Sequence, residues 1–167
     1  GDTEFCNMYA VYGALPEELK TRIDGLYGLH HAAKTKNRRV TISPGRPGAR
    51  EFYEAQAADR ADVIQPLVLV HPETGRRALY CSPRFTIGIK GLGEEESDAL
   101  LDALFPYITD RRRRYHYRHK YRPGDLVMWD NRCLCHRAVG GYGLPEIRRM
   151  HRTVGGGDRA FADQQAA

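Results

Sequence analysis

The sequence predicts a β-rich α+β domain, a sandwich or barrel of short strands with helices packed outside. Several short apolar segments are bounded by glycine, proline and aspartate, two segments have helical spacing, and strands and helices do not alternate regularly. A chain of 167 residues corresponds to one domain, residues 1–167. Its 41% hydrophobic content, with 10 Tyr and 5 Phe, excludes the disordered class.

The first helix is expected to begin at Pro16, because the fixed φ of proline suits the first helical position. Glu17 and Glu18 complement the positive end of the helix dipole. Its apolar face would contain Leu19, Ile23, Leu26 and His30. His30 and His31 would then end the helix, as a charge partner of its C-terminus or as a surface pair.

The second helix is expected to open at Gly93 and Glu94–Glu96. Its apolar face would consist of Leu100, Leu101, Leu104 and Phe105. Pro106 predicts a kink or a stop near its end.

Two segments lack a clear pattern. Residues 33–61 are rich in Lys, Arg, Pro and Gly, and we expect a mobile loop or lid there, with a short helix around Phe52–Ala58. Residues 155–167 begin with three glycines and are expected to form a polar tail.

The strand predictions follow from apolar, β-branched or alternating stretches. They are Val63–Val70, Arg77–Cys81, Phe85–Ile89, Leu126–Asp130, Cys135–Val139 and Ile147–Val154. Turns are expected at His71–Gly75 and Pro123–Asp125. His71-Pro72-Glu73 matches the His-x-carboxylate pattern, which is half of a facial iron site, but its setting between two strands favours a turn.

The positive charge of the chain is concentrated in one segment. The net charge is +5, and Arg111–Arg122 alone contains seven Lys or Arg and no acid, so the remaining residues sum to −2. We favour an alternating strand, with Tyr115, Tyr117, His119 and Tyr121 on one side. The alternative is a nucleic-acid surface, in which arginines contact phosphates and tyrosines stack on bases.

Candidate chemical groups lie near the C-terminal end. His136 has the residue type of a metal ligand, although a hydrogen-bonded structural histidine is the commoner case. Arg148 and Arg152 would share one strand face and form an anion pocket, unless that face is simply solvated. Cys133 and Cys135 are spaced too closely for a usual structural zinc site, so free thiols are expected.

Longer stretches resemble a known family. The segments GDTEFCNMYAVYGALPEELKTRIDGLYGLHH, HPETGRRALYCSPRFTIGIKGLGEEESDALLDAL, YRHKYRPGDLVMWDNRCLCHRAVGGYG and RRMHRTVGGGD occur in this order. Together they resemble the middle and C-terminal part of the taurine dioxygenase-like (TauD/TfdA) family of iron(II)- and 2-oxoglutarate-dependent dioxygenases.

The resemblance implies a double-stranded β-helix, or jelly roll, with iron(II) and 2-oxoglutarate at its open end. His136 matches the distal histidine ligand of the iron. Arg148 and Thr3 match residues that hold the far carboxylate of 2-oxoglutarate, and Arg152 matches an arginine that contacts an anionic substrate. Trp129 matches an aromatic residue that lines the pocket.

The resemblance also implies a small anionic substrate, such as a sulfonate or carboxylate, and O2 as co-substrate. The family's His-x-Asp iron motif has no match in these residues, so we expect the chain to be the C-terminal part of a longer polypeptide, with an incomplete jelly roll. A non-catalytic remnant of the fold is the alternative. We further expect a cytoplasmic protein that does not bind membranes, because no apolar run approaches about 20 residues and no leader is visible. The resemblance implies a homo-oligomer, and no nucleic-acid partner is expected.

Overall fold

The structure is a computed structural model that describes residues 1–32, 51, 54–55, 58, 61–140 and 150–155. The expected tail, Arg148 and most of the expected lid at residues 33–61 lie outside these residues. The elements in chain order are β1 (Thr3–Asn7), α1 (Met8–Gly13), α2 (Glu17–Ile23), β2 (Tyr27–His30), β3 (Val63–Pro66), β4 (Val68–Val70), β5 (Arg77–Leu79), β6 (Thr86–Ile89), α4 (Glu94–Thr109), β7 (His116–His119) and β8 (Leu134–Ala138). Residues 51, 54, 55 and 58 are helical and exposed, as the short helix expected over 52–58 requires.

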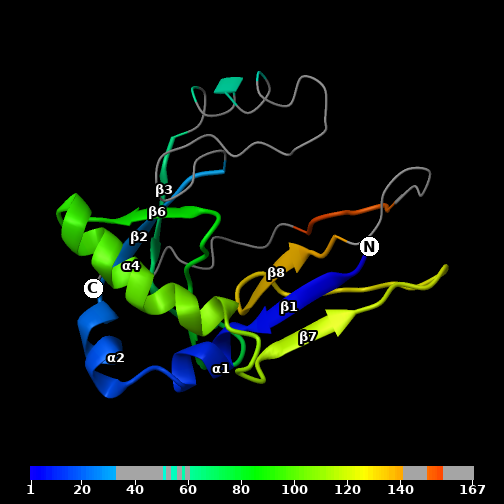
Figure 1. Ribbon diagram of the computed structural model, residues 1–167, viewed down its shortest axis with the longest axis horizontal. Coiled ribbons are helices and arrows are strands. Elements are labelled where there is room, and N and C mark those ends of the chain that lie inside the picture. Colours follow the sequence, from blue (N-terminus) through cyan, green and yellow to red (C-terminus); the bar gives the residue numbers. More distant parts are fainter. Residues whose placement is uncertain (33–50, 52–53, 56–57, 59–60, 141–149, 156–167) are drawn as a thin grey trace.

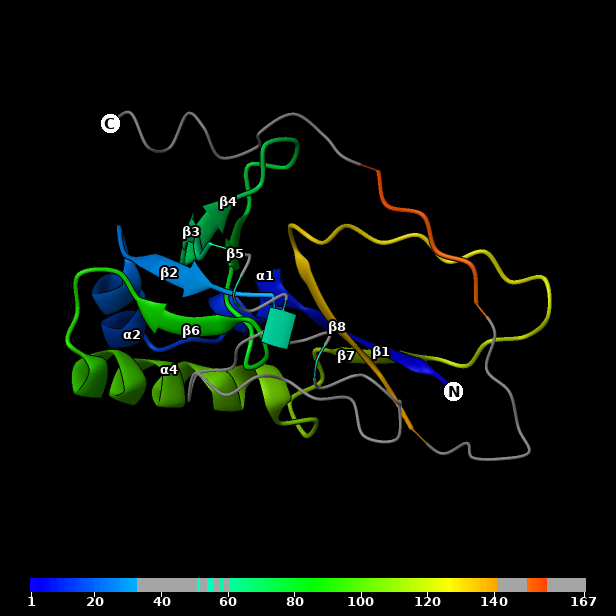
Figure 2. The same cartoon turned by 90° about the horizontal axis from the view of Figure 1, so that it is seen from above.

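The described strands form antiparallel sheets with the orders β7-β1-β8, β3-β2-β6 and β4-β5. Helix α4 runs along the β2–β6 sheet, and the β7-β1-β8 sheet extends away on the other side of α1 (Figures 1 and 2). The α+β prediction is therefore confirmed in its coarser form, because the described residues form a mixed α/β fold with antiparallel sheets. The closed jelly roll remains an expectation from the family.

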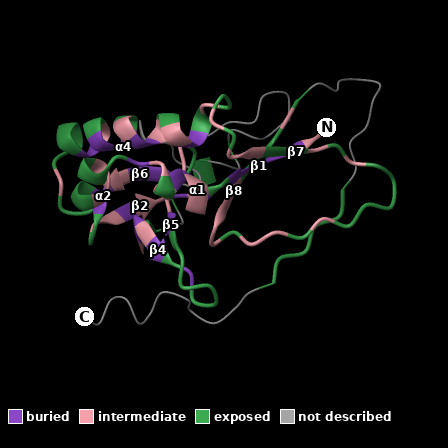
Figure 3. Cartoon of the chain, turned by 90° about the horizontal axis from the view of Figure 1, so that it is seen from below, coloured by how far each residue is buried: buried purple, intermediate pink, exposed green. Residues whose placement is uncertain are grey.

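The core lies between α4, α1 and the neighbouring strands, where the buried residues gather in Figure 3. Leu100, Leu101 and Leu104 of α4 are fully buried, as the apolar spacing predicted. Ser97 is also buried in α4, and its hydroxyl accepts a hydrogen bond from the Ile89 N–H of β6 at 2.9 Å. This bond fixes the helix against the sheet edge.

Pro106 does not stop α4, which continues to Thr109. Pro106 lacks an N–H donor, but its carbonyl still accepts a hydrogen bond from the Asp110 N–H at 3.0 Å. The last turn is therefore closed normally.

The first helix is shorter than predicted. It begins after Pro16 but ends at Ile23, and Gly25 at φ 72° turns the chain into β2. Leu26 therefore lies beyond the helix and His30 lies in a strand. His31 is 1% exposed, so the two histidines are not a surface pair.

Helix α1 was not predicted from the sequence, although its N-terminus has a recognisable capping residue. The side chain of Asn7 accepts hydrogen bonds from the N–H groups of Tyr9 and Ala10 at 3.1 and 3.2 Å. An asparagine at this position is a strong N-cap signal.

Four strand predictions need correction. The stretch Val63–Val70 is broken at Leu67 into β3 and β4. No strand forms over Leu126–Asp130, where Leu126 and Met128 are 93% and 92% exposed, because the chain offers them no partner strand among the described residues. Residues 150–154 likewise form no strand, and the basic segment contributes only the four residues of β7.

Candidate functional site

The β7-β1-β8 sheet brings together residues from the two ends of the chain. Phe5 of β1 pairs with His136 of β8 and with Tyr117 of β7, and Thr3 pairs with Ala138. Directly opposed residues of antiparallel strands project from the same face, and residues two apart share that face. Thr3, Phe5 and His136 therefore lie on one face of the sheet, which we call the site face.

Aromatic rings surround His136 on the site face. The ring centroid of Trp129 lies 5.0 Å from that of His136 and 5.3 Å from that of Phe5, and the Phe5 and His136 centroids are 6.1 Å apart. Trp129 reaches His136 although it does not belong to a strand. The structure thus places both predicted residues in one cluster.

The surroundings of His136 favour the neutral form of its imidazole. Burial lowers the pKa of its imidazole below the usual value, and the positive charge of Arg152 lowers it further. A neutral imidazole presents the free nitrogen lone pair that metal ligation requires.

Thr3 lies at the start of β1 and is 6% exposed. Its hydroxyl oxygen accepts a hydrogen bond from the Tyr121 hydroxyl at 3.2 Å, and Tyr121 also packs edge-on against His119 at 4.6 Å. The sequence analysis assigned Tyr121 only to a strand face. Its contact with Thr3 across 118 residues has no local sequence signal.

The two arginines of the expected anion pocket have different outcomes. Arg152 is exposed, lies outside any strand, and is close enough to affect His136. The prediction that Arg152 lies on a strand face is therefore wrong. Arg148, predicted to share that face, lies outside the described residues.

The opposite face of the same sheet carries ion pairs. The carboxylate of Glu4, which is 8% exposed, accepts hydrogen bonds from Arg137 at 2.6 Å and Arg111 at 3.2 Å. Asp2 pairs with Arg118 at 2.6 Å. Two further arginines of the basic segment, Arg112 and Arg113, pair with Asp110. Much of the basic segment thus neutralises acids of the chain itself, which favours a structural role over nucleic-acid binding.

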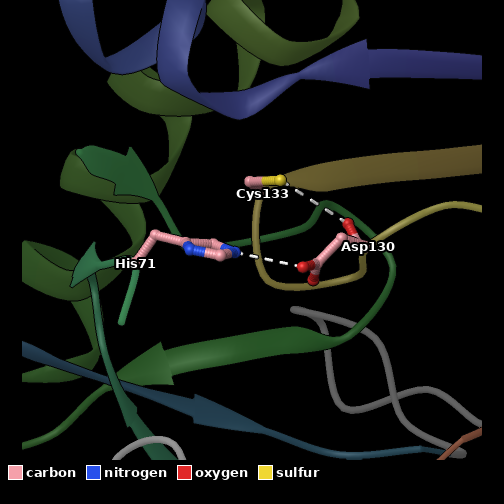
Figure 4. A group of neighbouring side chains, drawn as sticks. All are labelled: His71, Asp130 and Cys133. Atoms are coloured by element: carbon pink, nitrogen blue, oxygen red, sulfur yellow. Dashed lines mark hydrogen bonds and ion pairs between the residues drawn. The ribbon is translucent and has the colours of Figure 1, made fainter. Parts of the chain in front are cut away.

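A second cluster joins two turns. His71, Asp130 and Cys133 have potential ligand atoms within 4.8 Å of one another, and they form the one group of three or more such side chains among the described residues (Figure 4). Residues 72–74 form the turn that the sequence predicted, but His71 is 3% exposed, which the turn interpretation did not foresee. All four cysteines carry free thiols, and burial raises the pKa of Cys6 to about 12.

His136 fits as one ligand of a mononuclear metal site. A facial iron site needs two histidines and one carboxylate. Among the described residues, His136 belongs to no group of three potential ligands, so the remaining ligands of such a site are not supplied there.

The described residues form a mixed α/β domain in which the rings of Phe5 and Trp129 lie beside the candidate metal ligand His136. The family model of the taurine catabolism dioxygenases, the TauD, TfdA family, matches residues 1–154. The chain belongs to this family, as the sequence resemblance indicated.

Similar proteins are dioxygenases. An alpha-ketoglutarate-dependent 2,4-dichlorophenoxyacetate dioxygenase of Cupriavidus pinatubonensis is 39% identical over 92% of this chain and 50% of its own length. A solved taurine dioxygenase of Burkholderia xenovorans has a TM-score of 0.60 and 33% identity over 81% of this chain and 39% of its own. A structure of AAD-2 with Mn(II) and N-oxalylglycine has a TM-score of 0.63 and 34% identity, over 82% of this chain and 49% of its own.

The chain spans about half the length of the relative it matches in Cupriavidus pinatubonensis. None of the helices in the described part of the chain has the length and apolar character to cross a bilayer.

Proposed function

We propose that the polypeptide containing this chain is an iron(II)- and 2-oxoglutarate-dependent dioxygenase that hydroxylates a small anionic substrate. The observation that carries the proposal is the site face, where the family's candidate residues Thr3, Trp129 and His136 come together from distant parts of the sequence. Family membership supports the same reaction class.

Bound iron would supply the O2 activation that couples conversion of 2-oxoglutarate to succinate and CO2 with substrate hydroxylation. His136 would hold the metal through its neutral imidazole, whose low pKa keeps the lone pair free near pH 7. The other two protein ligands would come from residues outside those described, and the relative in Cupriavidus pinatubonensis is about twice as long as the stretch that matches this chain.

The chain's own polar residues would orient the two organic molecules. The buried hydroxyl of Thr3, with one bond already fixed by Tyr121, would donate to the far carboxylate of 2-oxoglutarate. Arg148 would pair with the same carboxylate through its planar guanidinium. Arg152, whose charge already reaches His136, would hold the anionic group of the substrate near the metal.

Trp129 and Phe5 would exclude water from one side of His136 and line the pocket. An aromatic wall beside an anion-binding arginine suits an aryloxyalkanoate, and the arginine alone suits a sulfonate. Dioxygenases named for each class are among the similar proteins.

The test uses the whole polypeptide, purified without metal. Anaerobic addition of iron(II) and 2-oxoglutarate should produce a visible metal-to-ligand charge-transfer band, and O2 with 2,4-dichlorophenoxyacetate or taurine should then yield succinate. The His136→Ala variant should lose tight iron binding. The matched control His116→Gln changes a histidine of the opposite face and should retain it. Absence of the band and of iron binding in the unmodified polypeptide would instead support a non-catalytic remnant.

The role of Arg148 has a separate test. Arg148→Ala should raise the 2-oxoglutarate concentration needed for half-maximal turnover by about tenfold or more, because a charged hydrogen-bonding partner is lost. An unchanged requirement would contradict this role.

A further inference from the structure

His71 has a fixed proton position. Its side chain is buried in the turn between β4 and β5, and its Nδ1 accepts a hydrogen bond from the Glu73 N–H at 3.3 Å. In the neutral imidazole the proton therefore lies on Nε2. This Nε2–H donates to Oδ2 of Asp130 at 3.0 Å, across 59 residues of sequence (Figure 4).

Asp130 is held from a second side by Arg132. The Arg132 backbone N–H donates to Oδ1 at 2.8 Å, and Arg132 Nε lies 3.0 and 2.9 Å from the two carboxylate oxygens. The same guanidinium donates to Glu73 at 3.0 Å. The turn at 71–75 and the turn at 130–133 are thus linked at two points, by His71 to Asp130 and by Glu73 to Arg132.

These bonds argue against reading His71, Asp130 and Cys133 as a metal site. A carboxylate offers about four lone-pair positions, and the guanidinium, the backbone N–H and the imidazole already occupy them. Hydrogen bonds from Arg132 also hold the pKa of Asp130 well below its usual range, and the positive charge of the guanidinium balances the negative charge of the carboxylate. The thiol of Cys133 is kept protonated, because burial raises its pKa.

The turn at 130–133 leads directly into the site face. The Asp130 carbonyl accepts from the N–H groups of Cys133 and Leu134 at 3.4 and 3.1 Å, which begins β8. The residue before Asp130 is Trp129. Its ring packs on His136, which lies two residues after the first residue of β8, Leu134. A displacement of the turn that the Asp130 carboxylate holds would therefore change the positions of both Trp129 and the start of the strand that contains His136.

We propose that His71 is a positioning residue, whose Nε2–H bond to Asp130 sets the placement of Trp129 and His136 in the active site. The inference rests on the proposed function. It assigns a role to a residue that lies outside the site face and touches neither His136 nor Trp129 among the contacts of the described residues.

The test compares His71→Leu, which has no donor, with His71→Gln, whose amide N–H restores one at a similar reach. Both are made in the whole polypeptide and loaded anaerobically with iron(II) and 2-oxoglutarate. Glu73→Gln is the matched control, because Glu73 lies on the same turn and contacts Arg132 but not Asp130. The first readout is the position and intensity of the charge-transfer band. The second is the amount of hydroxylated product per 2-oxoglutarate consumed.

We expect His71→Leu to alter the band and to lower the product yield per 2-oxoglutarate by about tenfold, because small displacements of reacting groups are costly. His71→Gln and Glu73→Gln should stay within about twofold of the unmodified protein, since each leaves a donor on Asp130 in place. A His71→Leu variant with lower thermal stability but an unchanged band and yield would overturn the proposal, because its role would then be structural alone.

If His71→Leu fails to fold, Asp130→Asn takes its place. This variant keeps the shape of the side chain and removes the charge that binds Arg132. It should alter the position or intensity of the charge-transfer band, as expected for His71→Leu. An unchanged band in this variant also contradicts the inference. An unmodified polypeptide that forms no band contradicts the proposed function itself and removes the inference with it, whereas a normal band with unaffected variants contradicts the inference alone.

Discussion

His30 makes the stability of this domain sensitive to mild acid. Its imidazole lies in β2, with Nδ1 3.2 Å from the Thr86 hydroxyl, and its buried Nε2 has no hydrogen-bond partner among the described residues. Burial lowers its pKa from 6.5 to about 4, because the charged ring would lose its hydration. In the unfolded chain the same ring titrates at its ordinary pKa.

The sign of the effect follows from proton uptake. Well above pH 6.5 neither state binds the proton, so protonation of His30 does not affect the free energy of unfolding. Between pH 6.5 and 4 the unfolded chain binds a proton that the folded chain does not. The free energy of unfolding therefore decreases as the pH is lowered through this range. Evaluated with these two pKa values, lowering the pH from 7 to 5 removes about 2 kcal/mol.

The assay is urea unfolding at pH 7 and pH 5, compared between the unmodified protein and His30→Gln. The unmodified protein should lose about 2 kcal/mol more than the variant over this interval. His151→Gln is the control, because His151 is exposed, and it should behave as the unmodified protein. Equal losses in the unmodified protein and His30→Gln would refute the argument.

Two packing predictions can be checked by the same unfolding assay at pH 7. Leu104→Ala should lower the free energy of unfolding by about 2–5 kcal/mol, because the side chain is fully buried in the core, whereas Leu126→Ala, at a residue 93% exposed, should change it by less than about 0.5 kcal/mol. Gly28→Ala should cost about 1–3 kcal/mol, because a Cβ there would lie 2.9 Å from Nε2 of His30. Gly13→Ala places its Cβ in open space and should not show this cost; equal effects of the two glycine variants would contradict the steric argument.

Local patterns predicted the elements that depend on local physics. The acidic start and apolar spacing of α4 identified the helix and its buried leucines, because a helix must turn one face to the core. The strands β5, β6 and β8 were predicted within two residues at each end. The first helix was extended too far, because Leu26 and His30 continue a helical spacing that Gly25 interrupts.

The segment Leu126–Asp130 shows why strand predictions fail. Four of its five residues are apolar, yet a strand exists only when a neighbouring strand exchanges hydrogen bonds with it. Among the described residues the segment has no such neighbour, and Leu126 and Met128 stay exposed. Sequence spacing alone cannot supply the missing partner.

The candidate site divides in the same way. The order of Thr3, Trp129, His136 and the two arginines along the chain was sufficient to indicate the family, since each residue sits in a recognisable stretch of sequence. The pairing of Phe5 with His136 and the bond from Tyr121 to Thr3 join segments more than a hundred residues apart. Their register is set by sheet assembly, which no local pattern encodes.

By itself the sequence indicated the family, through the resemblance of its long motifs, and it predicted helix α4 with its buried leucines, because helical spacing is a local pattern. Only the tertiary structure decided that His71 is buried and bonded to Asp130, and that much of the basic segment pairs with acids of the chain. Burial and long-range hydrogen bonds depend on which segments the fold brings together. The chemistry of a polar side chain is therefore settled by its neighbours in space rather than by its neighbours in sequence.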